Sequence, residues 1–305
     1  MNLIGNILYD TVYHSTPIIL AVLGGLFAYK ANVLNIGLEG MIVMGAFSSS
    51  LSILLFGNFY LGILIAITCT LLVGLIFSLF SITLKSNFII TGFGLNILVA
   101  AIGTFTLKFM KLSNINLSQI INVNDMKIAI PVVNEIPILS NILSNHTIIT
   151  YVAFLLIAVV YIVLYKTRFG IHLRVVGENE EAAKSVGLKS DMLKYSAILI
   201  GAVLCALAGI NLSAERMALY TDNMVAGRGF IAIAAIYCGK AHPVKSSIYA
   251  ILFGLARSLA INLGLYAGPI SGLFDMIPYI MIVLVLFFVS SMESKKTRLR
   301  GFRNA

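Results

Sequence analysis

The sequence predicts an all-α protein, a polytopic membrane helical bundle of about nine transmembrane segments, with eight to ten as the range. Composition is the first observation: 59% of the residues are hydrophobic and 11% are charged, whereas soluble domains are about 45–50% apolar and 25% charged. The second is the presence of uncharged runs such as Leu61–Leu84 and Tyr151–Tyr165. These runs do not alternate as barrel strands do, and a helix satisfies its own backbone in lipid.

Nine apolar stretches are the predicted spans, in a single transmembrane domain that covers residues 1–305. They are 16–29, 33–56, 60–84, 88–107, 147–165, 195–213, 225–239, 246–264 and 276–292. Residues 1–10 have neither the basic start nor the cleavage site of a signal peptide, so we expect the first span to be retained. Residues 2–13 have two further readings, an interfacial helix or a tenth span that would reverse the N-terminus.

The net charge of +9 is explained by where the Lys and Arg residues lie. They gather in the 166–194 loop, in the tail beyond residue 292, and singly at Lys30, Lys85, Lys240 and Lys245. Cytoplasmic loops are enriched in Lys and Arg, so a nine-span chain with its basic tail inside places all of these connections in the cytoplasm. Counting nine spans back from the cytoplasmic tail makes 108–146 an extracytoplasmic loop and puts the N-terminus outside. We expect membrane lipid around the spans and no nucleic-acid partner.

The cysteines do not predict a metal site or a disulfide. Cys69, Cys205 and Cys238 lie in three separate apolar runs, without CxxC spacing or His partners. Free cysteines in such runs pack as small hydrophobes. We therefore expect no metal and no cofactor in this chain.

Two segments in the first half resemble two in the second. The strings are GLEGMIVMGAF (37–47) with GRGFIAIAAIY (227–237), and LLVGLIFSLF (71–80) with ILFGLARSLA (251–260). The first match pairs Gly40 with Gly229, and the topology gives the paired segments opposite directions. Inverted repeats are typical of transporters, whose substrate sites lie near the midplane. Chance similarity between Gly-rich apolar stretches is the alternative.

Two of the predicted spans are short for a membrane crossing. The 16–29 span has fourteen residues before Lys30, and 225–239 has about fifteen. Such lengths predict broken helices. Their free ends expose backbone groups that bind a polar solute if they line a cavity.

Polar side chains inside the apolar spans are the candidates for a substrate pathway. Glu39 follows Asn35 by four residues, so on a helix the two share a face. A carboxylate at mid-membrane is costly and usually faces a cavity or a partner; near a span end it would instead snorkel or cap. Arg228 also has two readings, contact with substrate or an ion pair with Glu39.

The segment ITGFGLN at 90–96 is the second polar stretch. Thr91 and Asn96 would contribute hydrogen-bonding groups to the wall of the pathway, and Phe93 is available to stack on a base. Gly92 and Gly94 equally fit tight helix packing.

The loop between Lys166 and Lys194 is charged and able to form helix, inside an otherwise apolar chain. It contains EEAAKSVG at 180–187, in which small residues permit close contact and Gly187 can end a helix in the left-handed conformation. The loop is therefore a candidate docking surface. An ordinary solvated connector is the alternative.

Four motifs together resemble one family of membrane permeases. They are NIGLEG (35–40), ITGFGLN (90–96), GENEEAAKSVGL (177–188) and GRGFIAIAA (227–235). The loop resembles the coupling motif of ABC import permeases, and the set is similar to the permease family for branched-chain amino acids, simple sugars and nucleosides over about residues 16–290. The first and last motifs look most like nucleoside permeases that work with a basic-membrane-protein-like lipoprotein receptor.

The resemblance implies import into the cell across its inner membrane, powered by a separate ATPase subunit that holds the ATP and Mg. It also implies a second permease subunit and a substrate-binding lipoprotein. On the coupling surface it places Gly177, Glu181, Ala182, Ala183 and Gly187. The apolar-Pro element that usually follows in the family is not evident after Gly187, which bears on how the ATPase docks.

The chain has no motif for chemistry of its own. It lacks GxxxxGK[ST], HExxH and GxSxG. We therefore expect a transport subunit and no enzyme. A nucleoside is the expected substrate, with simple sugars (ribose or galactose) and branched-chain amino acids as alternatives. An ion-coupled secondary transporter, which would use a carboxylate such as Glu39 for coupling, is the alternative of a different class.

Overall fold

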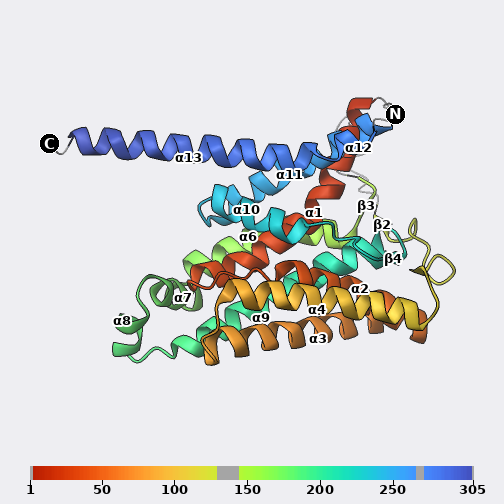
Figure 1. Ribbon diagram of the computed structural model, residues 1–305, viewed down its shortest axis with the longest axis horizontal. Helices are drawn as coiled ribbons and strands as arrows, with labels where there is room; N and C mark the ends of the chain where they lie inside the picture. Colours follow the sequence, from red (N-terminus) through yellow and green to blue (C-terminus); the bar gives the residue numbers. More distant parts are fainter. Residues whose placement is uncertain (1–2, 129–143, 266–270, 304–305) are drawn as a thin grey trace.

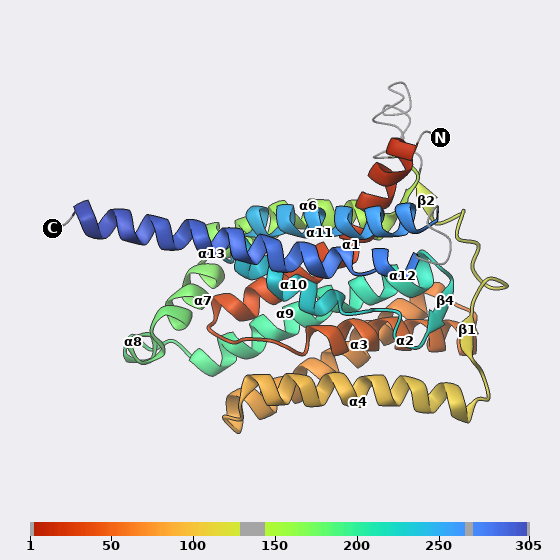
Figure 2. The same cartoon turned by 45° about the horizontal axis from the view of Figure 1, so that its top comes forward.

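The computed structural model describes residues 3–128, 144–265 and 271–303 and confirms the predicted all-helical bundle (Figures 1 and 2). Its first helices are α1 (Leu3–Lys30), α2 (Leu38–Phe56), α3 (Phe59–Ser78) and α4 (Phe88–Phe109). The later ones are α6 (Ile148–Lys166), α7 (Arg168–Glu178), α8 (Glu180–Ser185), α9 (Ser190–Ile210), α10 (Arg228–Cys238), α11 (Pro243–Gly264), α12 (Ser271–Phe274) and α13 (Ile277–Arg303). Helix α3 continues into the π-helical turn η1 (Leu79–Thr83), and α9 into η3 (Asn211–Glu215).

Eight helices among the described residues are long and apolar enough to cross a membrane. They correspond to eight of the nine predicted spans. The exception is the 225–239 stretch, where α10 has 11 residues and is about 16 Å long. Helix α10 therefore reaches only about halfway through a hydrocarbon core of roughly 30 Å.

The first span is not a broken helix, which corrects the prediction for 16–29. Helix α1 runs for 28 residues with Pro17 inside it, and its span is 89% buried. The polar residues before Pro17 do not interrupt it, because Thr11 donates to the Ile7 carbonyl and Thr16 to the Val12 carbonyl. Residues 3–13 thus belong to α1 and form neither an interfacial helix nor a tenth span.

The second span begins later than predicted. After α1 ends, Asn32 adopts a left-handed φ of 58°, and the chain has no regular helix until α2 begins at Leu38. Residues 31–37 form a re-entrant segment, which turns back along the bundle (Figure 2). Asn35 therefore does not share a helix face with Glu39.

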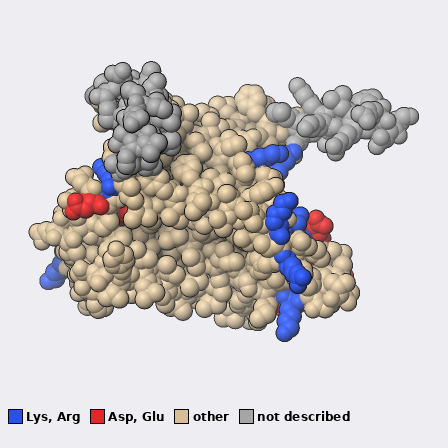
Figure 3. All heavy atoms as spheres, turned by 180° about the vertical axis from the view of Figure 1, so that it is seen from behind, with Lys and Arg blue, Asp and Glu red and all other residues tan. Residues whose placement is uncertain are grey.

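The connections predicted to be cytoplasmic lie at one end of the bundle, which we call the basic end. It holds the turns at residues 84–87 and 239–242 and the helices α7 and α8, and α13 extends past it (Figure 1). In the rear view, Lys, Arg, Asp and Glu gather at the two ends and the broad belt between them is uncharged (Figure 3). This belt is the surface expected to face lipid.

Short strands cover the opposite end, within and beyond the predicted 108–146 loop. Strand β1 (Asn114–Asn116) pairs antiparallel with β4 (Leu219–Thr221), and β2 (Lys127–Ile128) with β3 (His146–Thr147). These strands were not predicted, and each is only two or three residues long. Residues 129–143 of the loop lie outside the described part.

Which end faces the cytoplasm is testable with two exposed serines at opposite ends. We expect Ser118→Cys to react with an impermeant thiol reagent added to intact cells, and Ser185→Cys to react only after the membrane is opened. Both serines are exposed, so access from the bulk solution is the only variable. Labelling of both from the same side would contradict the predicted topology.

Candidate functional site

The first turns of α2 and α10 meet inside the bundle. The carboxylate of Glu39, on α2, accepts backbone N–H groups from Gly227 (2.8 Å) and Gly229 (2.6 Å). The first N–H groups of a helix have no intrahelical partner, and the positive end of the helix dipole favours an anion. Glu39 therefore caps α10 from another helix.

This meeting point lies well below the surface of the bundle. Glu39 adjoins Gly40, whose N–H donates to Asn96 on α4. Asn96 lies eight residues beyond Phe88, where α4 leaves the basic end, a depth of about 12 Å. From Arg228, α10 returns to the same end. Both helix starts thus lie near half the depth of the hydrocarbon core.

The two glycines matched in the predicted repeat occupy comparable positions. The Gly40 N–H donates to Asn96 Oδ1 at 2.8 Å, and the Gly229 N–H donates to Glu39 Oε2. A Cβ at Gly40 would lie 2.8 Å from Asn96 Oδ1, and one at Gly229 would lie 2.5 Å from the Glu39 nitrogen. Glycine is required at both because each helix start touches its cap directly.

Asn96 also holds the re-entrant segment against α4. Its Nδ2 donates to the Ile36 carbonyl at 3.0 Å, so both ends of its amide are engaged within the chain. A Cβ at Gly92 would lie 2.7 Å from Ile36 Cβ, whereas one at Gly94 would have nothing within 4 Å. Gly92 thus serves tight packing, and Gly94 lies on the open side of α4.

Asn35 is buried in the protein and does not line an open pathway. Its side chain is 4% exposed, its Nδ2 lies 3.7 Å from Met41 Sδ, and its Oδ1 is buried without a hydrogen-bond partner. Sulfur is a weak acceptor, so this amide is poorly satisfied where it lies.

The predicted ion pair between Arg228 and Glu39 is absent from the described part of the chain. The Arg228 guanidinium instead donates to the carbonyls of Met224 and Val225, each at 2.8 Å. It closes the turn that leads into α10, while Glu39 takes the N–H groups of that helix. Arg228 itself is only partly buried.

An exposed aromatic pair lies beside this meeting point. Phe93 on α4 stacks on Phe230 of α10, with ring centroids 5.8 Å apart and an interplanar angle of 28°. The two side chains are 48% and 39% exposed. Tyr279 of α13 donates to the Ala226 carbonyl just before α10, at 3.5 Å. Phe93 was predicted as a stacking residue and Phe230 was not, although Phe230 directly follows the matched Gly229. No sequence signal marks Tyr279.

Thr91 is not joined to this group. It lies half-buried on α4, five residues before Asn96, and in the described residues no side-chain hydrogen bond links it to Glu39 or Asn96. Its predicted place on the pathway wall stays a prediction.

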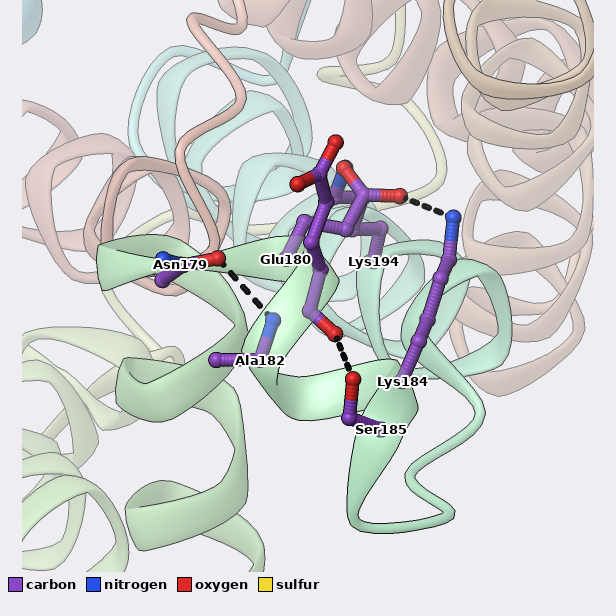
Figure 4. Close-up of polar contacts among 7 residues, drawn as sticks. Asn179, Glu180, Ala182, Lys184, Ser185 and Lys194 are labelled. Atoms are coloured by element: carbon purple, nitrogen blue, oxygen red, sulfur yellow. Dashed lines mark hydrogen bonds and ion pairs between the residues drawn. The ribbon is translucent and has the colours of Figure 1, made fainter.

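At the basic end, the predicted docking loop folds into α7 and α8 (Figure 4). Asn179 caps α8 by accepting the Ala182 N–H at 3.0 Å. Glu180 pairs with Lys184 on the same helix at 2.7 Å and with Lys194 on α9. These ion pairs hold the pKa of Glu180 at about 2, well below its ordinary 4.5. Helix α8 is thus fastened to α9.

Gly187 ends α8 in the predicted left-handed conformation, with φ at 81°. The Leu188 N–H donates to the Ala183 carbonyl (3.0 Å) and the Gly187 N–H to the Lys184 carbonyl (2.9 Å). These two bonds are those of a Schellman motif, which favours glycine at this position.

The coupling candidates divide into exposed and internal residues. Glu181, Ala182 and Gly187 are exposed, whereas Ala183 is fully buried against its own chain. Gly177 approaches the end of α1 so closely that a Cβ would strike the Lys30 carbonyl. The exposed surface instead includes Val186, at 73% exposure, which the sequence analysis missed. A groove of about 880 Å³ runs beside α8 and is lined in part by Glu181, Lys184 and Lys85.

The ion pairs of Glu180 predict an acid-sensitive α8. Because the folded pKa lies below the ordinary value, the stabilisation is present above about pH 4.5 and disappears as the pH falls toward 2. Glu180→Gln should remove it at every pH. We expect faster hydrogen exchange of the 180–188 amides in Glu180→Gln, and in the wild type only at low pH. The exposed Glu181→Gln is the control, and equal exchange in all three proteins would contradict the assignment.

A second buried carboxylate caps a helix at the other end of the bundle. Glu215 is 2% exposed. It accepts the Ile149 N–H in the first turn of α6 at 3.1 Å and the Asn211 side chain at 2.7 Å. Beside it, the Arg216 guanidinium lies 3.0 Å above the centroid of the Tyr13 ring. The π-helical continuation of α9 brings Glu215 inside, and sequence hydropathy gave no sign of it.

A bundle whose described residues form eight long apolar helices, with a short capped helix that starts at half depth, is a multi-pass membrane protein of the transporter class. The chain matches the family described as branched-chain amino acid transport system / permease component over residues 7–286. It belongs to that family of ABC importer permeases. It is therefore a transport subunit without catalytic activity, and it works with an ATPase.

Three relatives show how the family resemblance extends to named transporters. The nucleoside ABC transporter permease protein NupC of Lactococcus lactis is 30% identical, over 94% of this chain and 92% of its own. The guanosine ABC transporter permease protein NupQ of Bacillus subtilis is 32% identical, over 90% and 89%. The "Putative glucose ABC transporter permease protein TsgC13" of Haloferax volcanii is 30% identical, over 86% and 79%.

Proposed function

We propose that this chain imports nucleosides as a permease subunit of an ABC importer in the inner membrane. A separate ATPase supplies the energy, a second permease completes the pathway, and a lipoprotein receptor delivers the substrate. Two relatives at 30% and 32% identity are named for nucleosides or guanosine, which supports this substrate class.

The observation that carries the proposal is the aromatic pair at half depth. The side chains of Phe93 and Phe230 are both partly exposed beside the start of α10. Aromatic faces bind nucleobases by stacking, so this pair offers a surface for the base of a nucleoside.

The same surface is a poor partner for lipid tails. The Arg228 residue is only partly buried at half depth, and a charged side chain at that depth is costly against hydrocarbon. A protein partner or a water-filled path removes this cost. We therefore place the second permease opposite this face, with the substrate passing between the two subunits.

A sugar is the second candidate, because one relative at 30% identity carries glucose in its name. The test uses the complete transporter in proteoliposomes and labelled guanosine and adenosine. We expect ATP-dependent uptake that unlabelled nucleosides compete and that ribose, glucose and leucine leave unchanged. Uptake of labelled glucose or ribose without nucleoside uptake would favour the sugar, and uptake of leucine would favour a branched-chain amino acid.

The aromatic pair itself gives a sharper prediction. Base stacking on an aromatic side chain contributes about 1–3 kcal/mol, so Phe93→Leu should reduce nucleoside uptake roughly 5- to 150-fold while keeping an apolar side chain. Phe105→Leu is the matched control, since Phe105 lies on the same helix and is 70% exposed. Equal uptake by the two variants would remove Phe93 from the pathway.

The energy of ATP hydrolysis would enter through α8. Its exposed residues include the apolar Val186 and the small Ala182, which offer a knob and a flat face to a groove on the ATPase. The ion pairs of Glu180 tie α8 to α9, so a push on α8 is passed to a helix that spans the membrane. This tie is the physical link that the coupling proposal requires.

A further inference from the structure

A cavity of about 420 Å³ opens at the basic end, apart from the half-depth site. The ends of α1 and α10, together with α6 and α7, form its walls. Its lining includes Tyr29, Lys30, Tyr165, Arg174, Glu178 and Tyr237. The volume is within the range of small-molecule sites. Nothing in the transport proposal uses this cavity.

Two cations in this lining converge on one aromatic ring. Lys30 Nζ lies 6.0 Å from the centroid of the Tyr165 ring, and Arg174 Cζ lies 5.0 Å from it. Within the described residues, neither cationic group has a hydrogen bond or an ion pair. Arg174 Nε is buried and has no partner. Buried donors are nearly always satisfied. Lys30 and Arg174 therefore lack a hydrogen-bond acceptor that a bound ligand would supply.

The charge and shape of the lining indicate which chemical class of ligand would supply the missing hydrogen-bond acceptor. Glu178 also lines the cavity but is exposed, so two cations and one carboxylate leave a net charge of about +1 at neutral pH. Tyr29 and Tyr237 meet edge to face with centroids 5.3 Å apart and add aromatic surface. A guanidinium and an ammonium that line the same cavity suit the oxygens of a phosphate group.

We propose that this cavity binds a phosphate ester, held by Lys30 and Arg174. A singly charged phosphate diester would balance the net positive charge of the lining. The cavity lies where the spans end, at the level expected for lipid headgroups. The same chemistry is offered by an anionic phospholipid and by a soluble nucleotide. The inference concerns a site distinct from the substrate pathway, so it stands or falls separately from the proposed function.

The experiment measures binding to the complete transporter purified in detergent, by native mass spectrometry and by thermal unfolding. Phosphatidylglycerol and AMP are the two phosphate probes, and a glucosyl diacylglycerol with the same acyl chains is the lipid control without phosphate. We expect phosphatidylglycerol, and not the glycolipid, to bind and to raise the melting temperature. Binding of AMP alone would identify the phosphate ester as a soluble one.

Variants locate the binding in this cavity. Arg174→Gln and Lys30→Gln should each weaken phosphate-probe binding about tenfold or more, since hydrogen bonds to charged groups are the strong ones. Glu178→Gln should strengthen it, because it removes the carboxylate that the described residues contribute to the lining. Arg168→Gln, an exposed charge change on the same helix, should leave it unchanged.

The variants are expected to change probe binding in opposite directions, which distinguishes loss of a binding site from a folding defect. A variant that merely misfolds would not bind more tightly, so the gain in Glu178→Gln tests the site even if Arg174→Gln is unstable. The proposal is overturned if neither phosphate probe binds better than the glycolipid. It is also overturned if all four variants bind the probes as the wild type does.

Discussion

Replacing Glu39 with alanine is expected to abolish uptake and to destabilise the folded transporter by about 3 kcal/mol or more. The carboxylate accepts two backbone N–H groups, from Gly227 and Gly229, and hydrogen bonds to a charged group contribute about 1.5–3 kcal/mol each. Without it the start of α10 keeps two buried donors unpaired. Melting temperature and ATP-dependent uptake in proteoliposomes measure the two effects.

The Glu39→Gln variant separates charge from shape. Its amide keeps one acceptor oxygen but turns an N–H₂ group toward the second backbone donor, so we expect an effect between those of the wild type and Glu39→Ala. Glu181→Gln removes an exposed carboxylate and should change neither measurement. Wild-type uptake and stability in both Glu39→Gln and Asn96→Ala would show that this helix junction is not part of the pathway.

Replacing Val186 with aspartate is expected to uncouple the permease from its ATPase without unfolding it. Val186 is 73% exposed at the end of α8, so the free chain tolerates the charge. In the complex, burying an unpaired charge costs several kcal/mol, which should lower the co-purified ATPase about tenfold or more. Uptake should fall in proportion. Full recovery of the ATPase together with full uptake would leave α8 as a simple connector.

Two further substitutions complete that test. Met217→Asp adds the same charge at the opposite end, where Met217 is 54% exposed, and should leave ATPase recovery unchanged. Ala183→Asp is a poor probe of the contact, because Ala183 is fully buried in its own chain. We expect Ala183→Asp to unfold α8 and to reduce the yield of inserted protein, an outcome that says nothing about the ATPase.

The spans were predictable wherever the signal was a long run of apolar residues. Residues 60–84 and 88–107 are examples, because lipid-facing helices must be apolar nearly all round. The first span was misjudged because α1 is largely enclosed by protein, and a helix with little lipid contact can carry Thr11 and Thr16. The re-entrant segment was missed because its apolar residues continue the hydropathy of α2.

The candidate site was predictable only where the signal was local. Gly187 was read correctly because a glycine after a short helix is itself the signal for a left-handed end. Glu39 stood out as a charge in an apolar run, but its acceptor role depends on Gly227 and Gly229, which lie almost 190 residues away. Phe230 became visible only when the fold stacked it on Phe93, since pairwise long-range contacts leave no trace in one sequence.

The junction of α2 and α10 also has a consequence for the permeability of the membrane to ions. Each helix start contributes about half a positive charge, so with Arg228 and Glu39 the junction carries roughly one net positive charge at half depth. Positive helix ends of this kind repel protons and metal cations in other pores. A neutral solute feels no such barrier, so a path lined by this junction would pass the solute while the ion gradients across the membrane persist.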